Sequence, residues 1–273
     1  MDWILRFFKG ALIGTGFLLP GVSGGALAAI FGLYQRIVSF IAHIHKDFIK
    51  NVRFFIPVGL GALFGMFVLA WPLSFFLKHY EAQVIWGFIG CIIGTLPALW
   101  KEAGKEGREK RHYAILALSA IIGSVLLFAA RNYLSMQVPQ HFITWIFAGF
   151  IIALGVLVPG MSPSNFLIYF KMYDAMVDAF KLMDLMVLVP LLLGFAVCLF
   201  SLSALIDRLL AKIYAGMFHF VVGIVIASTL MIVPLNHNYA SAGTIVCGIA
   251  FIAGITLGFW MSRLEKKYKR SAA

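Results

Sequence analysis

The chain has 273 residues and a net charge of +11, and 62% of its residues are hydrophobic whereas 12% are charged. Soluble globular chains carry about 25% charged residues, so this composition excludes a water-soluble domain and predicts an all-α polytopic membrane protein. The excess of Lys and Arg is then an orientation signal, and we do not expect nucleic acid as a partner.

Eight apolar segments are expected to lie in the membrane. In chain order they are 10–34, 54–77, 84–100, 113–130, 142–173, 185–204, 213–233 and 243–262. Six have the roughly 17–25 mostly apolar residues that cross a hydrocarbon layer about 30 Å thick. The first and the fifth are interrupted by helix-breaking residues, Pro20-Gly21-Val22-Ser23-Gly24-Gly25 and Pro159-Gly160-Met161-Ser162-Pro163-Ser164. Each of these two is either a kinked span or a re-entrant hairpin that enters the membrane and returns.

The positions of the 22 Lys and Arg residues decide between these alternatives. Two through-going spans would divide the cations equally, 11 on each face of the membrane. Two hairpins would place 18 of the 22 on one face and leave four on the other, Lys78, Arg131, Lys171 and Lys181. Because Lys and Arg concentrate in cytoplasmic loops, we expect two hairpins, with both termini cytoplasmic. A signal peptide ending near Ala28 is the alternative at the N-terminus, but the same pattern recurs in mid-chain.

The two interrupted segments belong to an internal repeat. A shift of 139 residues gives ten identities in 29 positions, which begin with Gly10 on Gly149 and include the Pro, Gly and Ser of the breaker. A shift of 133 aligns three residues of the following spans, Pro57, Gly61 and Gly90, with Pro190, Gly194 and Gly223. We therefore expect two halves, 1–140 and 141–273, each with one hairpin and three spans. The odd number of crossings inverts the second half, as in many secondary transporters; the alternative is a duplication that only built a stable bundle.

Each breaker is expected to bring a helix N-terminus near the centre of the membrane. The free N–H groups and positive dipole end of a helix attract anions, and glycines let a ligand approach the backbone closely. The candidate groups are Ser23, Gly24 and Gly25 in the first hairpin and, in the second, Ser162 as N-cap before Pro163, with Ser164 and Asn165 as side-chain donors. Two facing copies favour an anion site, and the alternative is close helix packing through small residues.

Few ionisable residues lie within the apolar segments. Arg131, at the end of segment 113–130, is a candidate partner for a phosphate, and interfacial snorkelling is the alternative. We interpret His219 as a packed or interfacial histidine, with proton coupling as the alternative. His43 and His45 are expected on a surface. Asp174, Asp178 and Lys181 are expected on the polar face of an interfacial helix. No disulfide, metal site or cofactor is expected from the three separated cysteines, Cys91, Cys198 and Cys247.

The paired motifs resemble the DUF368 family. The resemblance rests on Pro20-Gly21-Val22-Ser23-Gly24-Gly25 with Gly32-Leu33-Tyr34, on Pro159-Gly160-Met161-Ser162 with Tyr173, and on Pro57, and it covers roughly residues 8–235. The second motif departs from the family's usual Ser-Gly-Ser at Ser162-Pro163-Ser164, and Lys171 stands where the family usually has glycine. The resemblance implies a bacterial plasma-membrane translocase that returns undecaprenyl phosphate from the outer to the cytoplasmic leaflet for cell-wall polymer synthesis.

We therefore expect a lipid flippase and not an enzyme. The phosphate would pass between the two hairpin tips while the isoprenoid tail stays in the surrounding lipid. The expected phosphate-binding residues are Pro20, Gly21, Ser23, Gly24, Gly25, Pro159, Gly160, Ser162, Ser164, Asn165 and Arg131. An undecaprenyl-pyrophosphate phosphatase-like enzyme is the first alternative, but no Glu, Asp or Arg lies within ten residues of Pro20 or Pro159. A transporter of a small soluble anion is the second, and the sequence leaves a homo-oligomer open.

Overall fold

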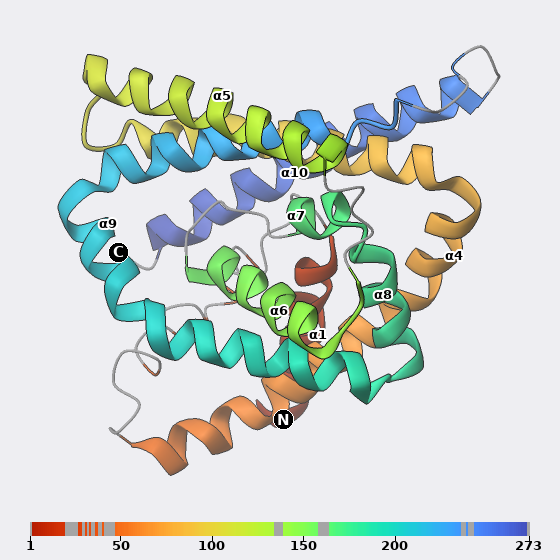
Figure 1. Cartoon of the computed structure of the whole chain (residues 1–273). Coiled ribbons are helices and arrows are strands. Elements are labelled where there is room, and N and C mark those ends of the chain that lie inside the picture. Colours follow the sequence, from red (N-terminus) through yellow and green to blue (C-terminus); the bar gives the residue numbers. More distant parts are fainter. Residues whose placement is uncertain are drawn as a thin grey trace.

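The fold is all-helical in the part of the chain that the structure, a computed structural model, describes. The described residues are 2–19, 27–28, 31, 33, 36–37, 40, 47–133, 139–157, 164–235, 239 and 243–271. Their helices are α1 (Asp2–Leu18), α4 (Phe48–Ala103), α5 (Lys110–Tyr133), α6 (Phe142–Leu157), α7 (Ser164–Tyr169), α8 (Tyr173–Leu182), α9 (Leu185–Met231) and α10 (Gly243–Ser271). Figure 1 shows the long helices α4, α5, α9 and α10 around the centre of the molecule, where the short helix α7 lies.

Five stretches of these helices are long and apolar enough to cross a membrane. One is α4 itself. The others are Lys110–Ala129 in α5, Leu185–Leu202 and Lys212–Met231 in α9, and Gly243–Arg263 in α10. Large apolar side chains on their outer faces are exposed, among them Ile121, Leu126 and Ile249. Such side chains match a lipid environment and not water. The expectation of an all-α polytopic membrane protein is confirmed.

Helices α4 and α9 are each longer than one membrane crossing. At about 1.5 Å per residue, the 56 residues of α4 would extend far beyond a hydrocarbon layer about 30 Å thick. Each helix bends at one non-helical residue, Tyr80 (φ −139°, ψ 41°) in α4 and Ile213 (φ −135°, ψ 40°) in α9. In Figure 1, α4 turns back on the right and α9 on the left, so the two bends lie at opposite ends of the molecule. Each long helix therefore has a first and a second arm.

The first arm of each long helix packs closely against a shorter helix. A Cβ added to Gly10 of α1 would lie 2.1 Å from the Val58 carbonyl oxygen of α4, so the two backbones touch. The equivalent glycine of the second half, Gly149 in α6, would bring a Cβ to 1.9 Å from the Leu191 carbonyl oxygen of α9. Val58 and Leu191 are themselves 133 positions apart, so the same contact recurs at corresponding positions.

The second arm of each long helix packs against a helix from the other half of the chain. In α4, Gly90 approaches Phe251 of α10, and a Cβ there would lie 2.2 Å from its carbonyl oxygen. In α9, Gly223 approaches Leu116 of α5, at 2.5 Å by the same measure. The last helix of each half therefore packs against the other half.

Candidate functional site

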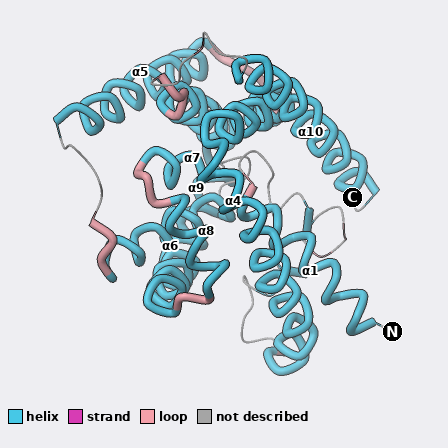
Figure 2. The backbone as a smooth tube through the Cα atoms, turned by 90° about the vertical axis from the view of Figure 1, so that its right-hand side faces the viewer, coloured by secondary structure: helices cyan, strands magenta, loops and turns pink. Residues whose placement is uncertain are grey.

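The two interrupted segments meet inside the molecule. Helix α1 ends at Leu18, which is 1% exposed, and the short helix α7 lies in the interior of the bundle in both Figure 1 and Figure 2. Leu18 belongs to one buried cluster with Ile152 of α6 and Leu167 of α7. The end of α1 and the short helix α7 are therefore covered by protein. Their unpaired backbone groups would be costly in lipid.

A tyrosine hydroxyl joins the two segments. Tyr173, the first residue of α8, is 1% exposed and donates a hydrogen bond to the Leu18 carbonyl oxygen. The last carbonyls of a helix have no partner within it, so this bond satisfies one of them at the end of α1. The sequence indicated Tyr173 as part of the repeated motif but gave no partner for its hydroxyl, because the partner lies 155 residues away.

Three of the expected phosphate-binding residues lie in described helices. Ser164 is the first residue of α7 and is 2% exposed, Asn165 follows it, and Arg131 lies near the end of α5. The hydroxyl of Tyr169, at the other end of α7, donates to the Leu127 carbonyl oxygen, which lies one turn of α5 before Arg131. The Tyr169 side chain therefore reaches the α5 backbone one turn from Arg131. The other expected residues lie outside the described residues: Pro20, Gly21, Ser23, Gly24, Gly25, Pro159, Gly160 and Ser162.

Helix α8 packs its apolar face against α4. Five of its ten residues are buried: Tyr173, Met176, Val177, Ala179 and Phe180. Its polar face also has a partner, because Asp178 forms an ion pair of 2.8 Å with Lys78 and accepts a hydrogen bond of 2.5 Å from Ser74. Burial raises the pKa of the Asp178 carboxyl, but the bonds from Lys78 and Ser74 and the nearby cationic charges outweigh it, so the net shift is downward.

His219 lies within an aromatic cluster at the start of the second arm of α9. Its ring is fully buried and stacks on His112 with centroids 5.2 Å apart, and its Nδ1 lies 2.6 Å from the Ala215 carbonyl oxygen. Nδ1 must carry the proton in this contact, because a carbonyl can only accept. This packing agrees with the interpretation of a packed histidine. No group of three His, Cys, Asp or Glu residues that could hold a metal ion occurs among the described residues.

Sequence reasoning missed a basic pocket where α1 and α4 begin. Four cations line it, Arg6, Arg36, Lys50 and Arg53. The sequence analysis counted them only as an orientation signal. A comparison of the two repeats could have singled them out, because none of them has a cationic counterpart in the second half.

Relatives of this chain are found among known proteins. Residues 13–248 match the family described as VCA0040-like, undecaprenyl phosphate translocase-like. A polyprenyl-phosphate transporter of Vibrio cholerae serotype O1 is 25% identical over 87% of this chain and 80% of its own length. A polyprenyl-phosphate transporter of Staphylococcus aureus is 29% identical over 94% of this chain and 96% of its own length. No solved structure matches the chain.

The family match covers both interrupted segments and most of the two repeats. The resemblance to DUF368 proteins that the paired motifs indicated is confirmed, and the two relatives are transporters by name and not enzymes. The chain belongs to the VCA0040-like, undecaprenyl phosphate translocase-like family.

Proposed function

We propose that this protein is a lipid flippase that returns undecaprenyl phosphate from the outer to the cytoplasmic leaflet of the bacterial plasma membrane. The carrier lipid then becomes available again for cell-wall polymer synthesis. The observation that carries the proposal is the meeting of the two interrupted segments inside a membrane protein of this family, at the bond from Tyr173 to Leu18. The polyprenyl-phosphate transporters to which the chain is similar support the same class of substrate.

The direction of the helices supports two re-entrant segments. Residues 6, 10 and 14 of α1 contact residues 54, 58 and 62 of α4, so the contacts advance the same way along both helices and the helices are parallel. Parallel neighbours begin at the same end of a molecule. A single crossing by segment 10–34 would instead make α4 antiparallel to α1. The contacts of Gly149 with Leu191 and of Gly194 with Ile146 correspond to those of Gly10 with Val58 and of Gly61 with Phe7, which supports the same arrangement for α6 and α9.

The positions of the basic segments and of the C-terminus support a cytoplasmic left end. In Figure 1 the start of α4, the connection from α4 to α5, the bend of α9 and the C-terminus all lie on the left. Most of the Lys and Arg residues belong to these segments, whereas Lys78 and Lys181 lie near the opposite bend. Because cations concentrate on the cytoplasmic side, the left end of Figure 1 is the cytoplasmic end in this proposal.

The phosphate path runs between the two hairpin tips. Moving a phosphate into an apolar layer costs many kcal/mol unless donors replace its water. In our proposal the hydroxyls of Ser23, Ser162 and Ser164, the amide of Asn165 and the guanidinium of Arg131 supply these donors, together with backbone N–H groups of the glycines. The isoprenoid tail stays in lipid, which fits the apolar outer faces of α5 and α10.

The test is a leaflet assay with purified protein in liposomes. A fluorescent polyprenyl phosphate in the inner leaflet is protected from an impermeant quencher, and a flippase removes this protection. We expect wild-type protein to accelerate its loss, and Ser23→Ala with Ser162→Ala to slow it by on the order of tenfold or more, since each lost donor to a buried charge is worth about 1.5–3 kcal/mol. An unchanged rate in the double variant contradicts the proposed path. No movement with wild-type protein, or release of phosphate from the pyrophosphate, contradicts the proposed function.

A further inference from the structure

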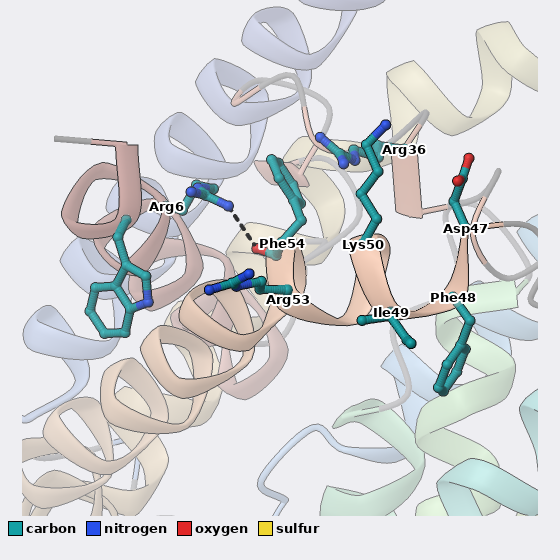
Figure 3. Close-up of a pocket in the computed structure, with 9 residues that line it drawn as sticks. Arg6, Arg36, Asp47, Phe48, Ile49, Lys50, Arg53 and Phe54 are labelled. Carbon is teal, nitrogen blue, oxygen red and sulfur yellow. Dashed lines mark hydrogen bonds between the residues drawn. The ribbon is translucent and has the colours of Figure 1, made fainter.

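A basic pocket opens where α1 and α4 begin, with a volume of about 770 Å³. Four cationic side chains line it against one carboxylate, that of Asp47. Figure 3 shows that they come from three separate segments, since Arg6 belongs to α1, Arg36 lies between α1 and α4, and Lys50 and Arg53 belong to the first turns of α4. A surplus of positive charge gathered from three segments favours an anionic ligand.

Two of the arginines are held around one aromatic ring. The guanidinium carbon of Arg36 lies 3.4 Å from the centroid of the Phe54 ring, and that of Arg6 lies 4.6 Å from it. Arg6 also donates to the Phe54 carbonyl oxygen at 3.3 Å, and Arg36 donates to the side-chain oxygen of Asn51 at 3.4 Å. Two like charges near one ring repel each other, and an anion shared between them would relieve the repulsion.

The other two cations belong to the N-terminus of α4. Lys50 and Arg53 are three residues apart on one helix face, and both are exposed. Within the described part of the chain, neither forms an ion pair or a side-chain hydrogen bond. The side chain of Asp47 does not cap the helix, so the first amides of α4 add their partial positive charge to the same pocket.

Exposed apolar side chains line the same pocket and favour a lipid over a soluble anion. Trp3 is 49% exposed, Phe48 is 50% exposed and Ile49 is 80% exposed. A free phosphate gains nothing from such neighbours. The phosphate of a lipid, in contrast, carries a hydrocarbon chain that these side chains can contact, and aromatic and basic residues together are typical of the membrane interface.

The second half of the chain packs in the same way without these cations. The contact of Gly10 with Val58 recurs between Gly149 and Leu191. The residues that correspond to the four cations under the shifts of 139 and 133 are all uncharged, namely Trp145, Ala175, Met183 and Met186. Helix packing therefore does not require the cations. Their role is specific to the end of the molecule where α1 and α4 begin.

We propose that this pocket binds the phosphate of the polyprenyl lipid at the membrane face where α1 and α4 begin, while Trp3, Phe48 and Ile49 contact the first part of the tail. The inference rests on the proposed function and adds a second phosphate site, distinct from the hairpin tips. With the topology proposed above, the pocket lies in the cytoplasmic leaflet. It holds the head group after the lipid has crossed.

Site-specific photocrosslinking in nanodiscs tests this inference. A benzophenone amino acid replaces Ile49 in the pocket or, as a matched control, Leu182, which corresponds to it in the second half and is 73% exposed. The probe is a radiolabelled polyprenyl phosphate. We expect labelling at position 49 to exceed that at position 182, and Lys50→Gln with Arg53→Gln to reduce it by on the order of tenfold.

A charge-matched control variant and three competitors separate the sources of the anion. Lys101→Gln with Lys110→Gln removes two exposed cations outside the pocket and should leave the labelling unchanged. Unlabelled polyprenyl phosphate should compete, whereas polyprenol, phosphatidylglycerol and inorganic phosphate at equal concentration should not. Equal competition by polyprenol shows that the phosphate is not recognised. Equal competition by phosphatidylglycerol or inorganic phosphate means a general lipid or a soluble-anion site, and any of these results overturns the inference.

The inference and the proposed function can fail separately. If wild-type protein moves polyprenyl phosphate in liposomes but labelling at positions 49 and 182 is equal, the proposed function stands and the proposed pocket is refuted. If wild-type protein does not move the lipid, the proposed function is refuted. A circular dichroism spectrum and a detergent Tm for each Gln variant establish that a lower labelling reflects lost charge and not lost fold.

Discussion

At the level of single residues, the hydroxyl of Tyr173 connects the two interrupted segments. Tyr173→Phe removes the bond to the Leu18 carbonyl and leaves that buried acceptor without its partner. We expect a loss of about 1–3 kcal/mol in the free energy of unfolding and a slower lipid translocation, because the end of α1 is no longer fixed against α8. Thermal unfolding in detergent and the liposome assay measure the two effects.

Tyr113→Phe is the matched control for this variant. Tyr113 lies near the start of α5, is 50% exposed and makes no side-chain hydrogen bond within the described part of the chain. Its loss of a hydroxyl should change neither Tm nor translocation. If Tyr173→Phe behaves like Tyr113→Phe in both assays, the hydroxyl does not connect the two segments.

The ion pair of Asp178 with Lys78 predicts a dependence of stability on pH. The pKa of Asp178 lies below its ordinary value of 3.8 in the folded protein, so the pair contributes stability above that value and loses it as the pH falls through the folded pKa. Asp178→Asn should therefore lower Tm slightly at neutral pH and make no difference once the pH is well below 3.8. The effect is about 1 kcal/mol or less, because the Lys78 side chain is 56% exposed.

A series of detergent melts between pH 7 and pH 3 checks this prediction. Asp174→Asn is the comparison, since Asp174 lies one turn earlier on α8 and outside the ion pair. The difference between wild type and Asp178→Asn should shrink with falling pH, and Asp174→Asn should lack this loss of stability at neutral pH. A constant difference for Asp178→Asn across the series would show that its charge is not responsible.

At the level of elements, backbone contacts at glycines determine how α1 lies on α4. Gly10→Ala would bring a methyl group to 2.1 Å from the Val58 carbonyl oxygen, a distance that forces the helices apart. We expect a loss of about 1–3 kcal/mol in stability, as for overpacked cores. Gly59→Ala is the control, because nothing lies within 4 Å of its added Cβ, and alanine there should stabilise α4 by about 0.5–1 kcal/mol.

Tm values of the two variants in detergent test this contact. Gly149→Ala, at the corresponding position of the second half, should behave like Gly10→Ala, since its methyl group would lie 1.9 Å from the Leu191 carbonyl oxygen. Equal stability of Gly10→Ala and Gly59→Ala would refute the close approach. A loss in Gly10→Ala without one in Gly149→Ala would show that the two halves pack differently.

Hydropathy predicted where helices cross but not where they are interrupted or how they pair. Segments 54–77 and 84–100 were expected as separate spans, and the structure agrees, because the chain leaves the helical conformation between them at Tyr80. The breakers predicted the end of α1 near Leu18 correctly. The hydrogen bond from Tyr173 to Leu18 could not be predicted, because sequence periodicity carries no information about partners 155 residues apart.

For the same reason the basic pocket could not be predicted as a site. Its cations come from segments whose neighbourhood depends on the parallel packing of α1 and α4, and a count of charges per loop treats them as independent. Comparison of corresponding positions in the repeat adds the missing information, since it separates residues that packing requires from residues that it does not. Gly10 belongs to the first class and Arg53 to the second.

At the level of the whole molecule, the two halves that the sequence predicts, 1–140 and 141–273, pack against each other through their long helices. Helix α5 packs on α9 and α10 packs on α4, so each half is completed by the other. A rearrangement during transport cannot separate residues 1–140 from 141–273 as rigid bodies without breaking these backbone contacts. Helices α1 and α6 instead make their backbone contacts with α4 and α9, within their own half of the chain.

The orientation of the whole molecule gives the last prediction, which concerns accessibility from the two sides of the membrane. The three native cysteines, Cys91, Cys198 and Cys247, are buried, so single cysteines introduced at exposed positions report with little background. Asp47→Cys and Glu106→Cys, at the end where α4 begins and ends, should react with an impermeant thiol reagent only after the cells are opened. Leu182→Cys, beyond the opposite bend, should react in intact cells. The proposed topology turns the 18 cations that the sequence assigns to one face toward the cytoplasm. Labelling of Asp47→Cys in intact cells would invert this topology and move the basic pocket to the outer leaflet.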